Sequence, residues 1–292
     1  MNENLNKARD AKNDEFYTQL SDIERELVHY REHFKDKVVY CNCDDPTRSN
    51  FFRYFSLNFE KLGLKRLITT CYSGKNGNSV PAYCLIYNGE QDGNEPDLSR
   101  MDVHFLEGDG DFRSPECVEL LKQADIVVTN PPFSLFREYI DQLVRYKKRF
   151  LIIGNDNAIT YRDVFKLIKE NRVWLGYDKV KEFHRPDGST QKFGNVGWFT
   201  NLETRKRHER FIFIREYAGN EQDYPKYDNY DAIEVSKVKD IPVDYDSVMG
   251  VPISFLDKYN PNQFRILACL SLPINNHTTY KRLLIKHEET TQ

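Results

Sequence analysis

The sequence predicts an α/β protein with a doubly wound, mostly parallel sheet and a smaller C-terminal region. As far as Gly176, short apolar runs typical of buried strands alternate with segments of helical periodicity. This alternation predicts parallel strands joined by crossover helices that cover both faces of the sheet. Polar stretches follow three of the strand-like runs, at Asn42–Pro46, Asp109–Asp111 and Asn130–Phe133. In such sheets ligands bind outside the carboxyl ends of the strands, so these stretches form the candidate site.

The expected helices show apolar residues at helical spacing and recognisable ends. A first helix begins at Ser21, where the sequence has the form of a capping box, and continues to Phe34. A second helix starts at about Phe51 and ends at Gly63, which suits a helix C-terminus. Later helices are expected at 115–122, 134–146 and 160–170, the last with a cap-like Thr160.

The expected strands are short runs of β-branched, aromatic and other apolar residues. In chain order they are 38–41, 67–71, 103–106, 125–129, 150–153 and 173–175. Residues 73–100 are rich in Gly, Asn and Asp, which predicts a loop or a small hairpin around Tyr83–Tyr87.

The pattern changes after Gly176. A charged segment at 178–195 predicts an inserted loop between two edge strands. Trp198, beyond this segment, is expected to be buried in the core. From residue 205 the chain is basic at first and then aromatic and punctuated by prolines. We therefore expect one domain over 1–204 and a second region over 205–292.

Composition favours a globular protein without a membrane segment. The chain has 292 residues, of which 13% are aromatic and 30% charged. No stretch is long and apolar enough to cross a bilayer, and the polar first residues do not resemble a signal peptide, so we expect a cytoplasmic protein. None of the six cysteines has zinc-ligand spacing. We interpret them as reduced thiols and expect no metal.

Charge is unevenly distributed along the chain. The net charge is -3, yet residues 145–215 hold 17 Lys and Arg against 8 Asp and Glu. A basic segment in an acidic protein suits a face that contacts phosphates. Solvated helix faces explain the same counts equally well. The basic candidates for nucleic-acid contact are Arg185, Lys192, Arg205, Lys206 and Arg207.

The stretch Asn130-Pro131-Pro132-Phe133 closes an apolar strand and opens a helix. A proline pair alone would simply end the strand, since proline cannot donate to a ladder. Asn130 and Phe133 add a second function, because the amide oxygen and a neighbouring backbone carbonyl can both accept hydrogen bonds from one amino group. Phe133 offers a face on which a planar ring can stack. Together they describe a site for a planar molecule that bears an amino group.

This stretch resembles the [DNS]PP[YFW] motif of class I methyltransferases, which modify exocyclic amines with S-adenosylmethionine. From Asn13 to Phe264, further segments look like the EcoRI-type family of adenine-specific DNA methyltransferases. These segments are 14–19, 30–34, 38–46, 108–113, 224–231 and 249–253. The resemblance implies a Rossmann-like methyltransferase sheet, with the catalytic domain at 1–204 and a target-recognition region at 205–292.

The resemblance also implies roles for particular residues. The methyl group would pass to a flipped adenine in duplex DNA, S-adenosylhomocysteine would be the product, and a monomer would suffice. Catalytic roles fall on Asn130, Pro131, Pro132 and Phe133. Cofactor contacts are expected from Phe16, Tyr17, Asn42, Asp44, Asp45, Asp109 and Asp111. Most such enzymes have a Gly-rich turn after the first strand, but here residues 41–46 stand in its place, as they do in EcoRI-type enzymes.

Two other functions stay open at this point. The fold also suits an RNA methyltransferase, or a nucleic-acid-binding scaffold without catalytic activity. The intact Asn130–Phe133 motif weighs against a scaffold, which has no need of this set of residues. The target sequence is not readable from the chain, nor is the choice between a cognate restriction endonuclease, an orphan role and a phage role.

Overall fold

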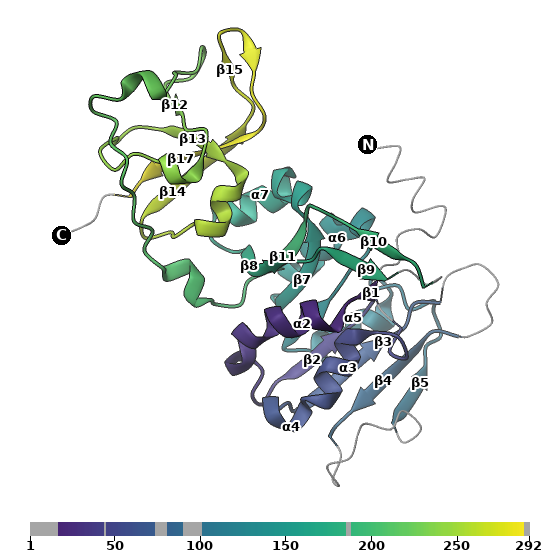
Figure 1. Cartoon of the computed structure of the whole chain (residues 1–292). Coiled ribbons are helices and arrows are strands. Elements are labelled where there is room, and N and C mark those ends of the chain that lie inside the picture. Colours follow the sequence, from purple (N-terminus) through teal and green to yellow (C-terminus); the bar gives the residue numbers. More distant parts are fainter. Residues whose placement is uncertain (1–16, 44, 74–80, 90–100, 185–187, 289–292) are drawn as a thin grey trace. The chain divides into compact units, whose positions relative to one another are not determined.

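The computed structural model describes residues 17–43, 45–73, 81–89, 101–184 and 188–288 (Figure 1). Packing divides the chain into two compact units, here called the large unit and the small unit. The large unit comprises Met1–Ala158 and Gly176–Leu202, and the small unit comprises Ile159–Leu175 and Glu203–Gln292. The functional division into 1–204 and 205–292 stays a prediction.

The large unit is built on a mixed sheet of eight strands. In spatial order they are β5 (Asp102–Phe105), β4 (Tyr83–Tyr87), β3 (Arg66–Thr70), β2 (Val38–Cys41), β6 (Ile126–Thr129), β7 (Arg149–Asn155), β11 (Val196–Thr200) and β8 (Trp174–Lys179). The strands β3, β2, β6 and β7 are parallel, as predicted. Two neighbouring strands run the other way: β4 is antiparallel to β3, and β11 is antiparallel to β7. All four residues of both β2 and β6 are buried, which explains their continuous apolar sequences.

Of the two structures predicted around Tyr83–Tyr87, the loop was wrong, and the small hairpin corresponds to antiparallel pairing within the main sheet. This segment is strand β4 of the main sheet, and its register pairs Leu67 with Tyr87 on β3. On its other side, β4 pairs antiparallel with β5. The chain between β3 and β4 contains no described helix to act as a crossover, so it returns alongside β3 in the antiparallel direction.

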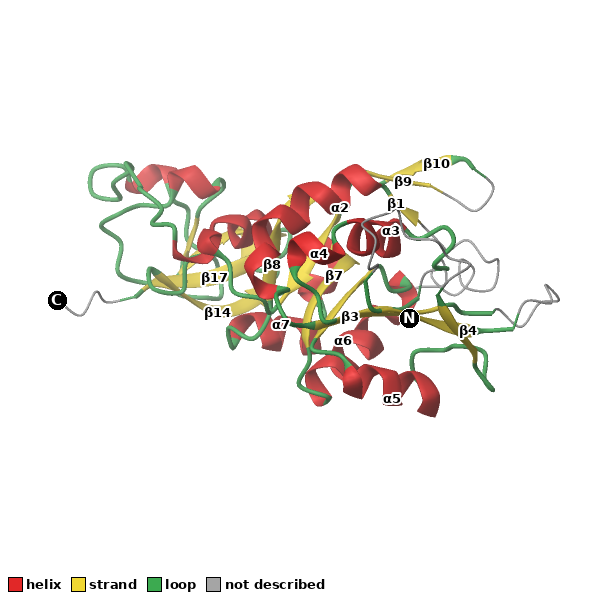
Figure 2. Cartoon of the chain, turned by 90° about the horizontal axis from the view of Figure 1, so that it is seen from below, coloured by secondary structure: helices red, strands yellow, loops and turns green. Residues whose placement is uncertain are grey.

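Helices cover both faces of this sheet, with α2 and α3 on one side and α5 and α6 on the other (Figure 2). Their bounds are α2 (Leu20–Leu27), α3 (Asn50–Leu57), α4 (Phe59–Leu62), α5 (Pro115–Gln123) and α6 (Phe136–Arg145). Short 3-10 helices follow α2 at Val28–His33, precede α6 at Phe133–Leu135, and follow β7 at Asp156–Thr160. Among described residues, no helix is long and apolar enough to span a membrane.

Two expected helix starts differ from the prediction. Helix α2 begins at Leu20 after Gln19, so Ser21 lies inside the helix and is not its cap. Asp22 of the expected capping box instead forms an ion pair with Arg25 one turn later. Helix α7 (Arg162–Lys169) begins after Tyr161, not after Thr160. Neither helix has a side-chain cap, and both starts differ from the prediction by one or two residues.

The core of the large unit is aromatic. Trp198 is 1% exposed, as expected for a core residue, and its ring lies 6.0 Å from that of Phe51 on α3. Phe34, after α2, packs against Phe55 of α3 with ring centroids 5.2 Å apart. These edge-on contacts fix α2 and α3 on the same face of the sheet.

A three-stranded sheet extends the large unit. It consists of β1 (Tyr17–Thr18), β9 (Glu182–His184) and β10 (Thr190–Lys192), all antiparallel. The expected inserted loop at 178–195 therefore contains a β-hairpin, whose strands are β9 and β10.

The small unit has a four-stranded sheet in the order β12-β13-β17-β14. The strands are β12 (Ile233–Glu234), β13 (Met249–Pro252), β17 (Arg282–His287) and β14 (Phe264–Leu270), and helix α7 contacts β14. A separate hairpin is formed by β15 (Pro273–Ile274) and β16 (His277–Thr278). Single 3-10 turns lie at Arg205–His208, Glu221–Asp223, Val238–Asp240 and Ile253–Lys258.

A buried carboxylate joins α2 to β8 in the large unit. Glu26 is 0% exposed, and its oxygens accept hydrogen bonds from the backbone nitrogens of Tyr177 and Asp178 at 2.7–3.1 Å. The Tyr30 hydroxyl donates to the same carboxylate at 2.8 Å. Gly176 is required beside it, because a Cβ there would lie 2.2 Å from Glu26 Oε1. Burial raises the pKa of Glu26 to about 7, against the pull of these donors.

Glu26 predicts a pH-dependent stability. Its ordinary pKa is 4.5, so between about pH 4.5 and pH 7 the unfolded chain releases this proton before the folded one does. The free energy of unfolding should therefore fall as pH rises through this window, by on the order of 3 kcal/mol, relative to a Glu26→Gln variant that cannot titrate. Urea unfolding of both proteins at intervals from pH 5 to pH 8 measures this. A difference between them that stays constant, or grows with pH, would show that the carboxylate is ionised throughout.

Candidate active site

The three polar stretches predicted from the sequence lie at one edge of the large sheet. Asn42 directly follows β2 and Asn130 directly follows β6, and these two strands are parallel neighbours. Strand β5, which precedes Asp109, is antiparallel to β4, which is itself antiparallel to β3. All three strands therefore end at the same edge, where α/β sheets bind their ligands.

Asn42 is buried and connects the first two strand ends. Its backbone carbonyl accepts a hydrogen bond from the Thr129 hydroxyl, on the residue before Asn130. Its side-chain oxygen accepts one from the hydroxyl of Tyr139 on α6. Complete burial raises the pKa of Tyr139 well above its ordinary value, so this hydroxyl stays protonated and remains a donor. The carboxamide oxygen predicted to contact the cofactor is thus used inside the protein.

The turn after Asn42 stands where most class I methyltransferases have a Gly-rich turn, and it contains a cysteine with a left-handed backbone conformation. Cys43 has φ +73°, a conformation that costs little only for glycine. Asp45 Oδ1 then accepts hydrogen bonds from the Thr47 backbone nitrogen at 2.9 Å and from the Tyr83 hydroxyl at 3.0 Å. Ser49 caps helix α3 through the Phe51 and Phe52 nitrogens. Asp45 therefore braces the turn against β4, and its neighbour Asp44 lies outside the described residues.

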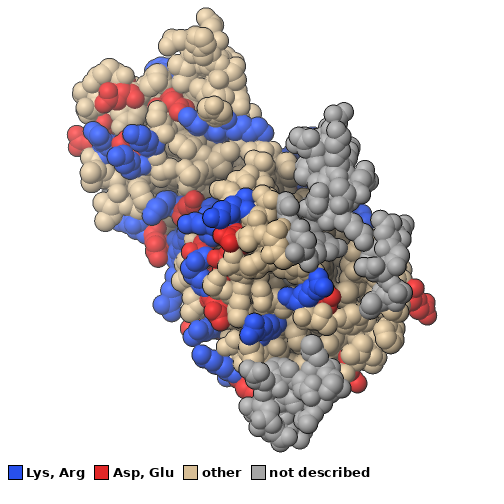
Figure 3. Space-filling model, turned by 45° about the vertical axis from the view of Figure 1, so that its right-hand side comes forward, with Lys and Arg blue, Asp and Glu red and all other residues tan. Residues whose placement is uncertain are grey.

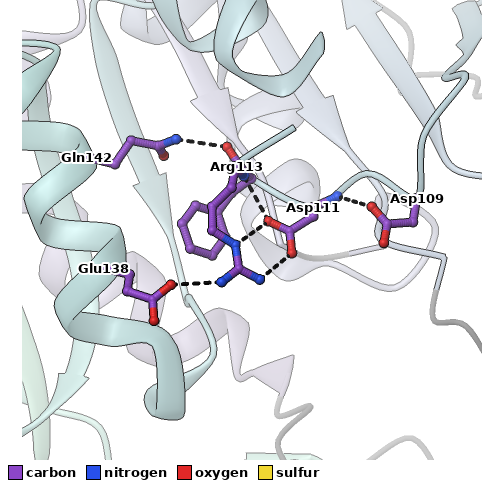
Figure 4. Close-up of polar contacts among 6 residues, drawn as sticks. Asp109, Asp111, Arg113, Glu138 and Gln142 are labelled. Carbon is purple, nitrogen blue, oxygen red and sulfur yellow. Dashed lines mark hydrogen bonds and ion pairs between the residues drawn. The ribbon is translucent and has the colours of Figure 1, made fainter. Parts of the chain in front are cut away.

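The Asp109–Arg113 loop is a tight turn held close to β3. Asp109 Oδ1 accepts from the Asp111 backbone nitrogen at 3.1 Å (Figure 4). Gly110 lies between them with φ +76°, and a Cβ there would stand 2.2 Å from the carbonyl oxygen of Cys71. Glu116 of α5 holds the start of the loop by accepting from the Glu107 and Gly108 nitrogens, both at 2.9 Å.

The same loop is tied to α6, the helix that follows the Asn130–Phe133 motif. Arg113 donates to Asp111 at 2.6 and 2.9 Å and to Glu138 of α6 at 2.7 Å (Figure 4). Gln142 of α6 donates to the Phe112 carbonyl at 3.0 Å. Burial alone would raise the pKa of Asp111, but the hydrogen bonds and charge of Arg113 outweigh it and hold the pKa below its ordinary value. Asp111 is thus an ionised anchor for Arg113.

The Asn130–Phe133 motif lies at the centre of this edge. Asn130 is 7% exposed, Pro131 is buried, and Phe133 begins the turn that leads into α6. The Phe133 ring lies 6.1 Å from Phe183 on β9 and 6.0 Å from Phe193, just after β10. Phe183 and Phe193 are themselves 5.4 Å apart. The β9–β10 hairpin therefore packs directly on the motif.

Sequence reasoning missed the residues that support the site. Tyr139, Glu138 and Gln142 look like ordinary positions of an amphipathic helix, and nothing local marks them as partners of the strand ends. Phe183 lies within β9 and Phe193 directly follows β10, two residues after Gln191, which pairs with Phe183. Both rings therefore lie on one face of the hairpin, which shows only once the strands are paired.

Two of the predicted flanking and basic residues, Tyr17 and Lys192, lie on the three-stranded sheet of the large unit. Tyr17 belongs to β1 and pairs with His184 of β9, while Phe16 and Arg185 lie outside the described residues. The Lys192 side chain on β10 is 83% exposed, with Nζ 3.9 Å from Glu182. Over the face in Figure 3, Lys and Arg side chains are interspersed with Asp and Glu.

The other basic candidates lie in the small unit, in the turn Arg205–His208. Arg205 is exposed, whereas the Arg207 side chain is only 11% exposed. The Arg207 guanidinium lies 3.7 Å from the Trp174 ring centroid and 3.5 Å from Glu203. Burial lowers the pKa of Arg207. The fold therefore already gives Arg207 structural partners, and Arg205 and Lys206 present the more accessible positive charges.

Comparison with known proteins points to one kind of enzyme. The family model described as adenine-specific methyltransferase EcoRI matches residues 4–292. The chain is 50% identical over 317 residues to the Type II methyltransferase M.EcoRI of Escherichia coli, covering 98% of this chain and 97% of that protein. It is 42% identical to M.MpnI of Mycoplasma pneumoniae and 39% identical to M.MgeORF184P of Mycoplasma genitalium, covering 95% of this chain and 89% of each relative. No solved structure matches the chain.

Removal of the Tyr139 hydroxyl tests the link between the strand ends. A Tyr139→Phe variant leaves the buried Asn42 carboxamide oxygen without this donor, and we expect a loss of about 1–3 kcal/mol in the free energy of unfolding. Urea unfolding at pH 7 measures the loss. Tyr280→Phe is the matched control, because that side chain is 88% exposed and its hydroxyl should contribute less than about 0.5 kcal/mol. Equal stability of Tyr139→Phe and wild type would contradict the assigned link.

Proposed function

The chain belongs to the EcoRI-type family of adenine-specific methyltransferases, and from this premise we propose how the edge of its large sheet methylates DNA. The chain is a DNA adenine methyltransferase. The proposal concerns the parts played by its residues: a flipped adenine held at Asn130–Phe133, with S-adenosylmethionine bound beside it. The single observation that carries the proposal is that α6 fastens the three strand ends together.

Asn130 and Phe133 hold the target base. An adenine must leave the duplex stack to reach the sheet edge, at a cost on the order of a few kcal/mol. Stacking on Phe133 offsets part of this cost, by about 1–3 kcal/mol. The Asn130 side-chain oxygen and the Pro131 carbonyl accept hydrogen bonds from the 6-amino group and direct its nitrogen lone pair. Pro132 has no amide hydrogen to compete for these acceptors and stiffens the turn.

The hydrogen-bond acceptors at this edge of the sheet suit S-adenosylmethionine. Bound there, this cofactor supplies an electrophilic methyl group on a sulfonium. Asp45 and Asp109 place carboxylates after β2 and β5, where they can accept from amino or hydroxyl groups, and the hydrogen bonds described above use Oδ1 of each. Cys43, whose φ lies in the left-handed region, comes directly after Asn42 at the same edge. Tyr17, Phe16 and Asp44 complete the proposed contacts.

Asn42 and Asp111 act on the cofactor site indirectly. Asn42 accepts from Tyr139 and Thr129, and Asp111 binds Arg113, so both position the turns that carry Asp45 and Asp109. Catalysis then depends on orientation and fixed dipoles in a pre-formed site.

Basic residues near the β9–β10 hairpin contact the DNA backbone. Lys192 is exposed on β10, and the hairpin packs on Phe133. Arg185 comes directly after β9 in the sequence and lies outside the described residues. Backbone contacts here would place the duplex over the motif. Arg205 and Lys206 add contacts from the small unit, whereas Arg207 mainly stabilises its own turn. One site and one flipped base make a monomer sufficient, and the name Type II methyltransferase of the relatives supports a cognate restriction endonuclease that acts separately.

Methyl transfer from labelled S-adenosylmethionine to unmethylated duplex DNA tests the proposed function. We expect label in 6-methyladenine at one short sequence and a fall of at least about 100-fold in kcat for Asn130→Ala. Equilibrium binding of the cofactor to both proteins is the control and should change little. Label that enters RNA in preference to duplex DNA would contradict the proposed substrate, and full activity of Asn130→Ala would contradict its role.

Phe133 can be tested separately as the stacking face. Phe133→Leu should weaken methylation, measured as kcat/KM, by about 5- to 150-fold, whereas Phe133→Tyr should retain most of it, because only the leucine loses the aromatic face. Phe193→Leu is the matched control, since it removes a ring from the same cluster. If Phe193→Leu lowers kcat/KM as much as Phe133→Leu, Phe133 acts by packing on the hairpin and not by stacking on the base.

A further inference from the structure

The β15–β16 hairpin of the small unit ends in a two-residue turn of asparagines. Pro273 pairs with Thr278 and Ile274 with His277, so Asn275 and Asn276 form the tip. Their φ angles are 50° and 63°, both in the left-handed region. Such a turn matches the twist of a hairpin and is the kind that asparagine tolerates best after glycine. The hairpin is the yellow loop labelled β15 at the top of Figure 1.

Asp228 fixes this tip from outside the hairpin. Its Oδ1 accepts from the Asn275 backbone nitrogen at 2.9 Å, and its Oδ2 accepts from that of Asn276 at 2.8 Å. The Asp228 backbone nitrogen donates to the Pro273 carbonyl at 3.0 Å. Three hydrogen bonds from one residue therefore hold a turn that an isolated hairpin of this length could not keep.

The base of the hairpin is equally well held. Leu272 is 7% exposed and packs with Tyr227, and its carbonyl accepts from both the backbone nitrogen and the hydroxyl of Thr279, at 3.0 and 2.8 Å. The Tyr227 hydroxyl donates to buried Glu234, which also binds Arg282 at 2.8 Å. The segment 224–231 thus supports the hairpin, a role unconnected with the edge of the large sheet.

The side chains at the tip are exposed although the backbone is fixed. Asn275, Asn276, His277 and Thr278 are all exposed, and Tyr280 beyond them is 88% exposed. From Lys258 to His287 the chain has no Asp or Glu, but it has five Lys or Arg. The hairpin therefore presents uncharged hydrogen-bonding groups in a basic stretch of the sequence, and the Asp228 carboxylate at its tip is bound by the two turn nitrogens. Neutral polar groups beside Lys and Arg suit contact with a nucleic acid.

We propose that this hairpin reads base edges in the major groove and that Asp228 is a positioning residue for target specificity. The inference rests on the proposed function, DNA methylation at the large sheet. A two-stranded ribbon fits the major groove, where an asparagine can pair with the N6 and N7 groups of adenine and a threonine methyl can contact thymine. A fixed turn places these groups without the entropy loss of ordering a mobile loop. The segment 224–231 then serves sequence recognition.

The test separates the amides from the turn that carries them. The double variant Asn275→Gly with Asn276→Gly removes both side chains and keeps the turn, because glycine accepts a left-handed φ. Asp228→Ala keeps both asparagine side chains but removes the two carboxylate hydrogen bonds that hold the turn. Asp36→Gly is the matched control, since Asp36 is exposed and has φ 58° in the large unit. Thermal unfolding and cofactor binding should be unchanged in the glycine variants.

The readout is selectivity between the mapped target duplex and duplexes with one base pair changed. It is measured both as the ratio of kcat/KM values and as the ratio of binding constants from competition. We expect the double glycine variant to lose about 5- to 150-fold of this ratio at one or two positions, with kcat on the target within about twofold of wild type. Asp228→Ala should lose selectivity at the same positions, and Asp36→Gly at none.

Two results distinguish this inference from the proposed function. Unchanged selectivity in both hairpin variants, with the fold intact, would overturn the inference and leave DNA methylation standing. Selective binding by a wild-type protein that transfers no methyl group would overturn the proposed chemistry alone, and loss of that binding selectivity in the variants would still support the hairpin as the reader.

Discussion

The hydrogen bonds that Asn42 accepts from Thr129 and Tyr139 are the constraint on which the rest of the site depends. They join the ends of two parallel strands and the helix that crosses behind them. Asn42, Thr129 and Tyr139 are all buried, and leaving one of their polar groups unpaired would lower the stability of the fold. The two strands and the helix are therefore held in one relative position. The Asp109–Arg113 loop is then added to the same helix through Glu138 and Gln142. A single helix therefore carries the geometry of three strand ends.

Much of this fold could be predicted because its strands are buried on both faces. Continuous apolar runs identify β2 and β6, and the polar residues after them locate the site. The antiparallel strand β4 could not be predicted in the same way, since its direction follows from pairing with β3 and not from its own residues. The register and direction of a strand depend on the strand it pairs with, so they cannot be read from one segment alone.

The class of enzyme could be predicted better than the roles of individual side chains. Asn130 and Phe133 are identified by their order at a strand end. Carboxylates and amides in loops read alike in a sequence, and only the structure shows that Asp111 binds Arg113 while Asn42 binds Tyr139. Arg207 shows the same limit, since a basic run predicts contact with phosphates until its partner Trp174 is seen. The contacts that each group makes in the fold decide what it does, whether the partner is two residues away, as for Asp111, or 97 away, as for Asn42.

The packing of Phe133 against Phe183 and Phe193 has a consequence for the timing of base capture. A ring held by two neighbours has already lost much of its rotational freedom in the free enzyme. An arriving base then finds a surface that needs no further ordering, and the encounter should be limited by the opening of the duplex and not by rearrangement of the protein. In the proposed mechanism, the hairpin that holds the ring also carries Lys192, so the DNA backbone would approach and the base would be captured on one preassembled surface.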